Sequence, residues 1–221
     1  MHILCIILNN AFLSFTHIGN LTLNSNVTCD SIVGRTSCIN IIQDDITLDC
    51  NGYSIIGPGH ENSVGFFVFG NNTIIKNCNV ENFRDGIQTQ SARGLSSAVT
   101  VESTTFSNND IGIAQIGGSL TLKNVLVENN GEGLNVAGFE GAKLTIENGY
   151  FCNNSVKDII AASSVSCPGV KATGQIFAST FESRFFNCSI DDVINESLEE
   201  NGFGPIKSCT DLVAQQSLLD V

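Results

Sequence analysis

The polar side chains best suited to binding chemistry lie in and beside one segment of the chain, QTQSARGLSSA from Gln88 to Ala98. They are Arg84, Asp85, Gln88, Gln90 and Arg93. A guanidinium donates hydrogen bonds in a fixed fork, and a glutamine amide both donates and accepts them. Because functional residues concentrate on loops carried by rigid scaffolds, we predict a binding edge at this segment. The alternative is a solvated surface loop in which Arg84 contacts its neighbour Asp85.

A second candidate is His60, in the sequence GPGHENS from Gly57 to Ser63. Its imidazole is the only one after His17, and histidine is the side chain whose charge changes near neutral pH. An exposed histidine without a role is the alternative. No two cysteines have the CxxC spacing of a zinc or redox site, so we expect no metal and no cofactor.

Five similar stretches of the sequence indicate the scaffold that would position these residues. They are ITLDC (Ile46–Cys50), TIIKN (Thr73–Asn77), VTVES (Val99–Ser103), LTLKN (Leu120–Asn124) and LTIEN (Leu144–Asn148). Aligned, they give an apolar column of Leu48, Ile75, Val101, Leu122 and Ile146, and a column of alternating charge of Asp49, Lys76, Glu102, Lys123 and Glu147. Opposite charges on neighbouring strands attract. The alignment therefore predicts parallel strands, each coil lying on the last.

The same register continues beyond these strands. Five residues after the apolar column come Val80, Phe106, Val127 and Phe151, then Asn82, Asn108, Asn129 and Asn153, then Gly86, Gly112 and Gly133, each followed by an aliphatic residue. In the fourth pass Lys157-Asp158-Ile159 replaces the glycine and its neighbour, with one extra residue. We predict that the phenylalanines are buried. We also predict that the asparagines form a turn, because Asn tolerates left-handed backbone angles and its amide can bond the Asn of the next coil.

The spacing of the repeats decides the fold class. From Ile75 the steps along the apolar column are 26, 21 and 24 residues, as in solenoid proteins. A strand-helix-strand unit needs about 30 residues, so the crossover must itself be strand. Parallel connections are right-handed. The sequence therefore predicts an all-β fold, a single-stranded right-handed parallel β-helix.

Three longer stretches carry a resemblance to a known family: LDCNGYSIIG (Leu48–Gly57), NTIIKNCNVENFRDGI (Asn72–Ile87) and LTLKNVLVENNGEGL (Leu120–Leu134). They resemble the β-helix repeats of the pectate-lyase-like (pectin lyase-like) superfold, over about residues Leu21 to Ile190. That superfold includes pectate lyases, polygalacturonases, alginate epimerases, phage tailspikes and surface proteins with no known reaction. The resemblance implies that the stacked asparagines are the superfold's asparagine ladder.

The catalytic motifs of those enzymes are missing from the sequence. An epimerase-like chain would show Asp-Pro-His-Asp, and a polygalacturonase-like chain would show four further motifs, of which only the paired acids of Asp44 and Asp45 are shared. The outward positions after the glycines carry no acid for general catalysis or calcium binding: they are Gln88, Gln90, Ala114, Ile116, Asn135 and Ala137. We therefore expect a non-catalytic structural or carbohydrate-recognition module. A diverged polysaccharide lyase, hydrolase or epimerase is the alternative.

The net charge of the chain limits the classes of partner that we expect it to bind. A formal net charge of −12 disfavours nucleic acid, whose phosphates would be repelled. It also disfavours polyanionic pectin or alginate unless Ca²⁺ bridges the two sets of carboxylates. A neutral polysaccharide or cell-surface glycan, a protein partner, or no ligand at all stay open. We expect no integral membrane segment, because the apolar start of the chain is too short to span a bilayer as a helix.

The cysteines and the start of the chain favour an extracellular or cell-surface location. Met1–Phe15 is a candidate signal segment, although Asn9 and Asn10 interrupt it and no Lys or Arg precedes its apolar core. Removing it would take Cys5 and leave eight cysteines, an even number suited to disulfides. The alternative is buried free thiols behind a truncated start. We predict a Cys29–Cys38 disulfide, since only eight residues separate the pair, and, with weaker support, the pairs Cys152–Cys167 and Cys188–Cys209.

The chain divides into residues 1–15, the candidate signal segment, 16–190, the β-helix, and 191–221, an acidic cap or tail. We expect an irregular first coil from Leu21 to Asn40 and a last coil from Ile176 to Ile190. The last part carries seven acids against one lysine. Whether the chain is part of a longer solenoid stays open.

Glycosylation motifs add little on their own. Six N-x-S/T sequons occur, at Asn20, Asn26, Asn71, Asn153, Asn187 and Asn195, and roughly four would arise by chance under the simple motif rule. A glycan on Asn153 would compete with the role expected for that residue in the ladder.

Overall fold

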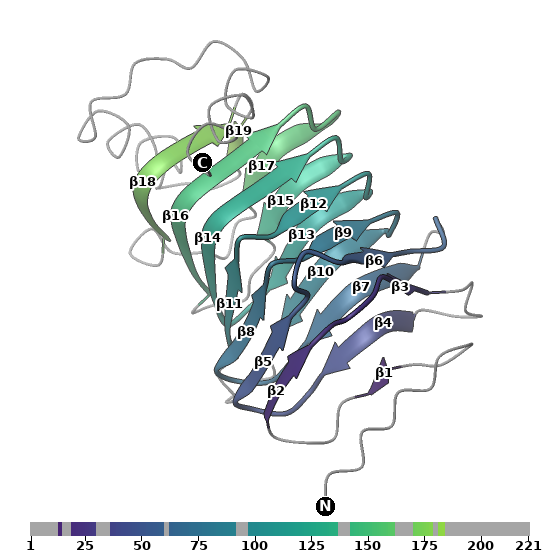
Figure 1. The fold of residues 1–221 in the computed structure, drawn as a ribbon. Coiled ribbons are helices and arrows are strands. Elements are labelled where there is room, and N and C mark those ends of the chain that lie inside the picture. Colours follow the sequence, from purple (N-terminus) through teal and green to yellow (C-terminus); the bar gives the residue numbers. More distant parts are fainter. Residues whose placement is uncertain are drawn as a thin grey trace, which may run out of the picture.

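The structure is a computed structural model of the chain (Figure 1). It describes residues 13–14, 19–29, 36–59, 62–91, 97–136, 142–161, 170–178 and 181–183. Within these residues the regular structure is all strand, and no helix occurs. The strands wind into a parallel β-solenoid of about five turns. This confirms the predicted fold class and is consistent with right-handed winding.

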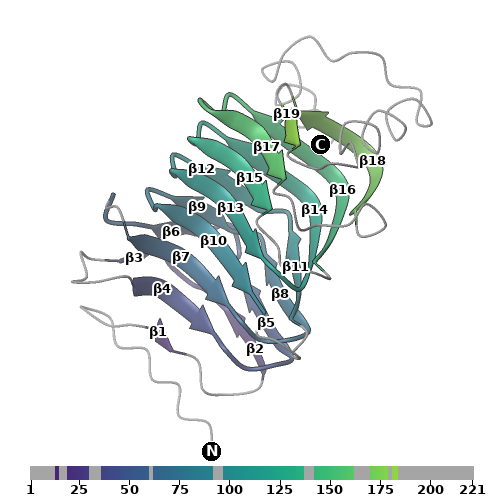
Figure 2. The same ribbon diagram turned by 180° about the vertical axis from the view of Figure 1, so that it is seen from behind.

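One wall of the solenoid is an eight-stranded parallel sheet, seen from its own side in Figure 2. In spatial order its strands are β1 (Leu13–Ser14), β4 (Thr36–Ile41), β7 (Ser63–Val68), β10 (Asp85–Gln90), β13 (Ile111–Ile116), β15 (Glu132–Val136), β17 (Lys157–Ala161) and β19 (Phe181–Ser183). Neighbouring strands in this wall are therefore one repeat apart in the sequence.

The rest of each turn belongs to a second sheet that bends into two arms. The first arm contains β2 (Gly19–Thr22), β5 (Ile46–Asp49), β8 (Thr73–Lys76) and β11 (Ala98–Glu102). The second arm contains β3 (Val27–Thr28), β6 (Ser54–Ile56), β9 (Asn79–Glu81) and β12 (Thr105–Ser107). The long strands β14 (Ser119–Glu128), β16 (Lys143–Cys152) and β18 (Val170–Ala178) run through the bend and belong to both arms.

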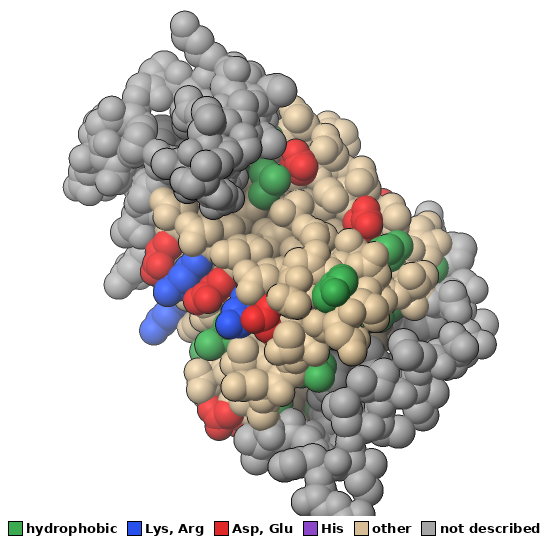
Figure 3. Space-filling model, viewed as in Figure 1, with side chains coloured by type: hydrophobic (Ala, Val, Ile, Leu, Met, Phe, Trp, Pro, Cys, Tyr) green, Lys and Arg blue, Asp and Glu red, His purple; other side chains and the backbone are tan. Residues whose placement is uncertain are grey.

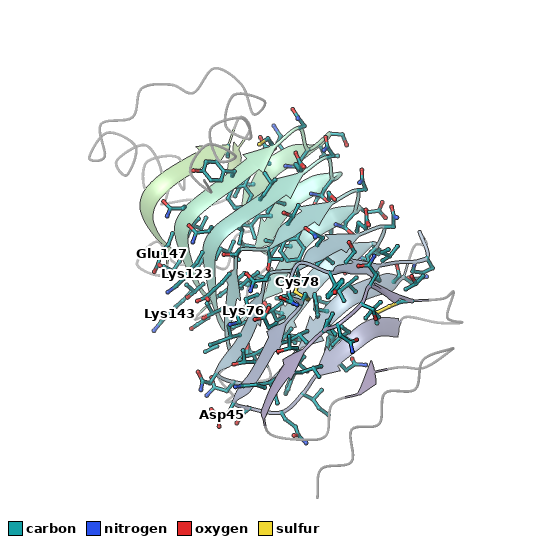
Figure 4. All side chains as sticks on the ribbon, in the orientation of Figure 1. Asp45, Lys76, Cys78, Lys123, Lys143 and Glu147 are labelled. Atoms are coloured by element: carbon teal, nitrogen blue, oxygen red, sulfur yellow. A yellow bond between two sulfur atoms is a disulfide. The ribbon has the colours of Figure 1, made fainter. Side chains whose placement is uncertain are left out.

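The strands stack in the register that the alignment predicts. Val101 pairs with Ile75 on one side and with Leu122 on the other, and Leu122 pairs with Ile146. The charged column follows at the next position, where Glu102 lies between Lys76 and Lys123. Figure 4 shows the labelled side chains of this column on one outer face of the first arm. A slip of one residue would turn every apolar side chain to solvent, so the burial of the interior fixes this register.

The interior is filled by the predicted apolar columns. Val80, Phe106, Val127 and Phe151 stack across the second arm and are fully buried. A second column runs along the first sheet through Ile87, Ile113, Leu134 and Ile159. Ile159 thus takes its expected place despite the extra residue before it. Burying each of these side chains stabilises the fold by about 1.5–3 kcal/mol.

The asparagine ladder lies one residue later than predicted. Asn82, Asn108, Asn129 and Asn153 do adopt left-handed backbone angles, with φ of 63°, 56°, 57° and 54°, but their side chains are exposed. The following residue instead points into the turn. Asn109 Nδ2 donates to Asn130 Oδ1 at 3.0 Å, and Asn130 Nδ2 donates to Asn154 Oδ1 at 3.0 Å. The predicted turn conformation is confirmed, and the predicted ladder residues are wrong.

Asp158 ends the ladder. Its Oδ1 accepts a hydrogen bond from Asn154 Nδ2 at 2.7 Å, and the residue is completely buried. The position occupied by Asp158 belongs to the glycine column of the earlier coils. There the backbones approach so closely that a Cβ on Gly86 would lie 2.6 Å from the carbonyl oxygen of Gly112. This close approach explains the repeated glycine before each aliphatic residue.

The two expected end coils are only partly described, since residues 30–35 of the first and 179–180 and 184–190 of the last lie outside the described residues. Strands β2, β3 and β4 form the first coil, and Cys29 and Cys38 are joined there by a disulfide with a Cα–Cα distance of 5.8 Å. Strands β18 and β19 extend the stack beyond β16 and β17. Most of the candidate signal segment and the whole of the acidic part, 191–221, lie outside the described residues. No helix long and apolar enough to cross a bilayer occurs in the described part of the chain.

Candidate functional site

The predicted binding edge is only partly described. Arg84 Nε lies 3.8 Å from Asp85 Oδ1, and the Asp85 side chain is almost completely buried. The neighbour contact that the sequence suggests is therefore present. Arg93, in the middle of the segment, and His60, the second candidate, lie outside the described residues.

The two glutamines of this edge differ in their exposure. Gln88 is on the outer face of β10, between Phe67 and Ala114 of the adjacent strands, and it is only 5% exposed. Gln90, at the end of the strand, is half-buried. Gln88 therefore offers a ligand little surface, and the binding role of the whole edge stays a prediction.

A different surface, at the bend of the second sheet, is more open. The bend is made by one residue per coil in the left-handed conformation: Asn51, Asn77, Ser103, Asn124 and Asn148, with φ between 46° and 59°. Asparagine adopts this conformation more readily than most residues. The sequence therefore places an amide or a hydroxyl at the bend of every coil in this range.

A depression lies along this bend, and we name it the bend depression. It is lined by Asn51, Gly52, Asn77, Cys78, Asn79 and Ser103, from three successive coils, and has a volume of about 330 Å³. This volume is at the lower end of the range for small-molecule sites. Figure 4 labels Cys78, which lines the depression, and Lys76, two residues before it in the chain, near the middle of the solenoid.

Hydrogen bonds hold part of this lining in place. Asn77 Nδ2 and the backbone N–H of Asn51 both donate to Asp49 Oδ1, at 2.9 Å and 2.8 Å. Asn79 Nδ2 donates to the carbonyl oxygen of Gly52 at 2.9 Å. Asn51, Asn79 and Ser103 are exposed. An amide group and a hydroxyl both donate and accept hydrogen bonds, so the surface matches a neutral ligand rich in hydroxyl groups.

A disulfide pins the floor of the bend depression. Cys50 and Cys78, on adjacent coils, are bonded with a Cα–Cα distance of 4.8 Å, and both are buried. The sequence interpretation missed this pair. The available signal was that Cys50 ends the stretch ITLDC and Cys78 comes directly after the aligned stretch TIIKN, so stacking of the two stretches brings both cysteines to the same bend on adjacent coils. The link ties two coils and limits their separation at the site.

The electrostatics beside the bend depression are balanced. Lys76 Nζ lies 3.3 Å from Asp49 Oδ2, and Lys123 Nζ lies 3.4 Å from Glu147 Oε2. Figure 3 shows acidic and basic side chains alternating on this face. The hydrogen bond from Asn77, followed by that from the Asn51 backbone and the proximity of Lys76, holds the pKa of Asp49 below its usual value. The alternation leaves little net charge here, although the whole chain is strongly acidic.

Within the described ranges, no group of three or more His, Cys, Asp or Glu side chains is placed to hold a metal ion. Cys152 is disulfide-bonded, and its predicted partner Cys167 lies outside these ranges, as do Cys188 and Cys209.

Comparison of the chain with protein-family profiles, with curated proteins and with solved structures finds no match.

Proposed function

We propose that this protein is a non-catalytic, extracellular or surface-exposed β-solenoid of the pectate-lyase-like superfold, and that it binds a neutral polysaccharide or cell-surface glycan at the bend depression. The observation that carries the proposal is the lining of this depression by Asn51, Asn77, Asn79 and Ser103 on three stacked coils. Such groups hydrogen-bond sugar hydroxyls without a charged partner.

The scaffold supports this function because it is stiff where the ligand would lie. Two coils are linked by the Cys50–Cys78 disulfide, and a hydrogen bond to Asp49 orients the side-chain amide of Asn77. A preorganised surface loses little conformational entropy on binding, which favours affinity. A glycan lying along the solenoid axis would meet a polar group at each coil, about 4.8 Å apart.

The balanced charge of the face supports a neutral ligand. A polyuronate would gain little from Lys76 and Lys123, since Asp49 and Glu147 already engage them. The disulfides support the location, because such bonds form and persist in oxidising compartments.

The test is a binding assay of the full chain against immobilised neutral polysaccharides, with pectate and alginate as charged comparisons. Changing Asn51 and Ser103 to glycine removes two of the four polar side chains of the lining and keeps the left-handed backbone angles. Asn82→Gly is the matched control, because Asn82 is also exposed and left-handed but lies at the other turn.

We expect neutral polysaccharides to bind, the double variant to lose at least tenfold in affinity, about 1.4 kcal/mol, and the control to match the unmodified chain. Absence of binding to every neutral polysaccharide, or equal binding by the double variant, would contradict the proposal. Release of unsaturated products or new reducing ends from any substrate would favour the diverged enzyme instead.

A further inference from the structure

The sequon at Asn153 lies in a projecting turn of the solenoid. The turn connects β16 to β17, and Asn153, Ser155 and Val156 in it are exposed, with Val156 reaching 59%. Asn153 has a φ of 54°, which turns its side chain away from the interior. Both elements of the sequon, the acceptor amide and the hydroxyl two residues later, are thus open to solvent.

The ladder does not need the amide of Asn153. The neighbouring residue, Asn154, makes the buried hydrogen bonds, with Nδ2 donating to Val127 O at 3.1 Å and to Asp158 Oδ1 at 2.7 Å. The conflict expected from the sequence, between a glycan and the ladder, is therefore removed by the one-residue displacement of the ladder. A sugar on Asn153 would extend into solvent while Asn154 keeps its contacts.

Three other sequons are described, of which those at Asn20 and Asn26 are also exposed but are engaged in the backbone pairing or hydrogen bonding of the first coils. Asn26 Oδ1 accepts a hydrogen bond from the backbone N–H of Ser54 at 3.0 Å. Asn71 is half-buried, and its backbone N–H donates to Asp44 Oδ1 at 2.6 Å. Asn20 is exposed but lies within strand β2, paired with β5. Asn187 and Asn195 lie outside the described residues.

We propose that Asn153 is an N-glycosylation site whose oligosaccharide is carried on Nδ2. The donor is a lipid-linked pyrophosphate oligosaccharide. The bond between the sugar C1 and the pyrophosphate oxygen breaks, a C1–Nδ2 bond forms, the amide loses one proton, and the lipid pyrophosphate leaves. The inference rests on the extracellular location proposed above, because this transfer occurs in the secretory lumen.

The test is to express the full chain behind a heterologous secretion leader in a eukaryotic host and to map its peptides by mass spectrometry. Treatment with a glycosidase that releases N-glycans, in ¹⁸O-labelled water, marks each formerly glycosylated asparagine as a labelled aspartate. We expect this label at position 153. The added leader delivers the chain to the lumen whatever its native start does. If the chain without this leader is not exported, that result counts against the proposed location and not against the site at Asn153.

Three variants complete the design. Ser155→Ala and Asn153→Gln should each abolish the label on this peptide. Asn129→Gln is the matched control, since Asn129 occupies the same exposed, left-handed position one coil earlier but is followed by Asn130-Gly131 and so has no sequon; it should leave the label unchanged. If Asn153 carries no label in the secreted chain of native sequence, the proposal is wrong. This outcome does not depend on the folding of any variant.

Discussion

Replacing Asn130 by alanine should destabilise the solenoid far more than replacing its neighbour Asn129. Asn130 is buried, and its side chain takes part in four hydrogen bonds. Oδ1 accepts from the backbone N–H and the Nδ2 of Asn109, at 2.9 Å and 3.0 Å. Nδ2 donates to Phe106 O at 3.1 Å and to Asn154 Oδ1 at 3.0 Å.

The size of the effect follows from these contacts. Each hydrogen bond contributes about 0.5–1.5 kcal/mol net, so losing four costs about 2–6 kcal/mol. The buried N–H of Asn109 loses its acceptor, which favours the upper half of that range. Asn129 is exposed, and glycine accepts its φ of 57°, so Asn129→Gly should cost about 0.5 kcal/mol or less.

The assay is equilibrium unfolding in guanidinium chloride, followed by circular dichroism on oxidised protein, for the unmodified chain, Asn130→Ala and Asn129→Gly. We expect a large fall in the free energy of unfolding for the first variant only. Equal losses, or a larger loss for Asn129→Gly, would refute the placement of the ladder.

The remaining predictions concern the core, a buried hydroxyl and acid stability. Phe106→Ala should cost about 3–5 kcal/mol, and Lys123→Glu no more than about 1 kcal/mol, because the first is fully buried and the second lies in an exposed ion pair; similar losses in denaturant would show the inside–outside assignment to be wrong. Thr89→Val should leave the free energy of unfolding unchanged or raise it by about 1–2 kcal/mol, because Oγ1 of Thr89 is buried and has no hydrogen-bond partner among the described residues; a clear loss of stability would contradict this. The pKa of Asp49 is lowered from 3.8, so its contribution is present above the unfolded-state pKa and is lost as the pH falls through the lower folded-state pKa. Unfolding measured in this acid range should show a shallower pH dependence for Asp49→Asn, and an unchanged slope would count against the assignment.

The strand register was predictable because two independent patterns agree on it. The apolar column at Val101 and the charged column at Glu102 repeat together, and only one alignment satisfies both. The interior phenylalanines follow from the same alignment, since Phe106 and Phe151 recur at a constant offset of five residues from the apolar column, beside Val80 and Val127.

The ladder could not be placed by pattern alone. Several coils carry two consecutive asparagines, such as Asn129 and Asn130, and either can be read as the ladder position. The left-handed angle of the first residue decides which side chain enters the turn. The column that begins at Asn82 has one more asparagine than the true ladder, which begins at Asn109. In the coil of Asn82 the inward position is held by Phe83, whose backbone N–H donates to Asn109 Oδ1 at 2.9 Å.

The bend depression could not be predicted from the sequence, for a different reason. The depth of the bend depression depends on how three coils bend at Asn51, Asn77 and Ser103, which composition does not encode. The burial of Gln88 was likewise not predictable from its own strand, whose lateral neighbours at this position, Phe67 and Ala114, come from the coils on either side. Alternation along one strand predicts whether a side chain points inward or outward, but it does not predict whether neighbouring residues bury an outward side chain.

The measurement that tests the central claim most directly is a two-dimensional NMR titration of the isotopically labelled full chain with a neutral oligosaccharide that the binding assay identifies. The side-chain amide signals of Asn51, Asn77 and Asn79 should shift in a saturable way, while those of Asn108 and Asn129 at the other turn stay in place. Saturable shifts confined to Gln90 and the segment beyond it, or no shifts in the bend depression, would contradict the account.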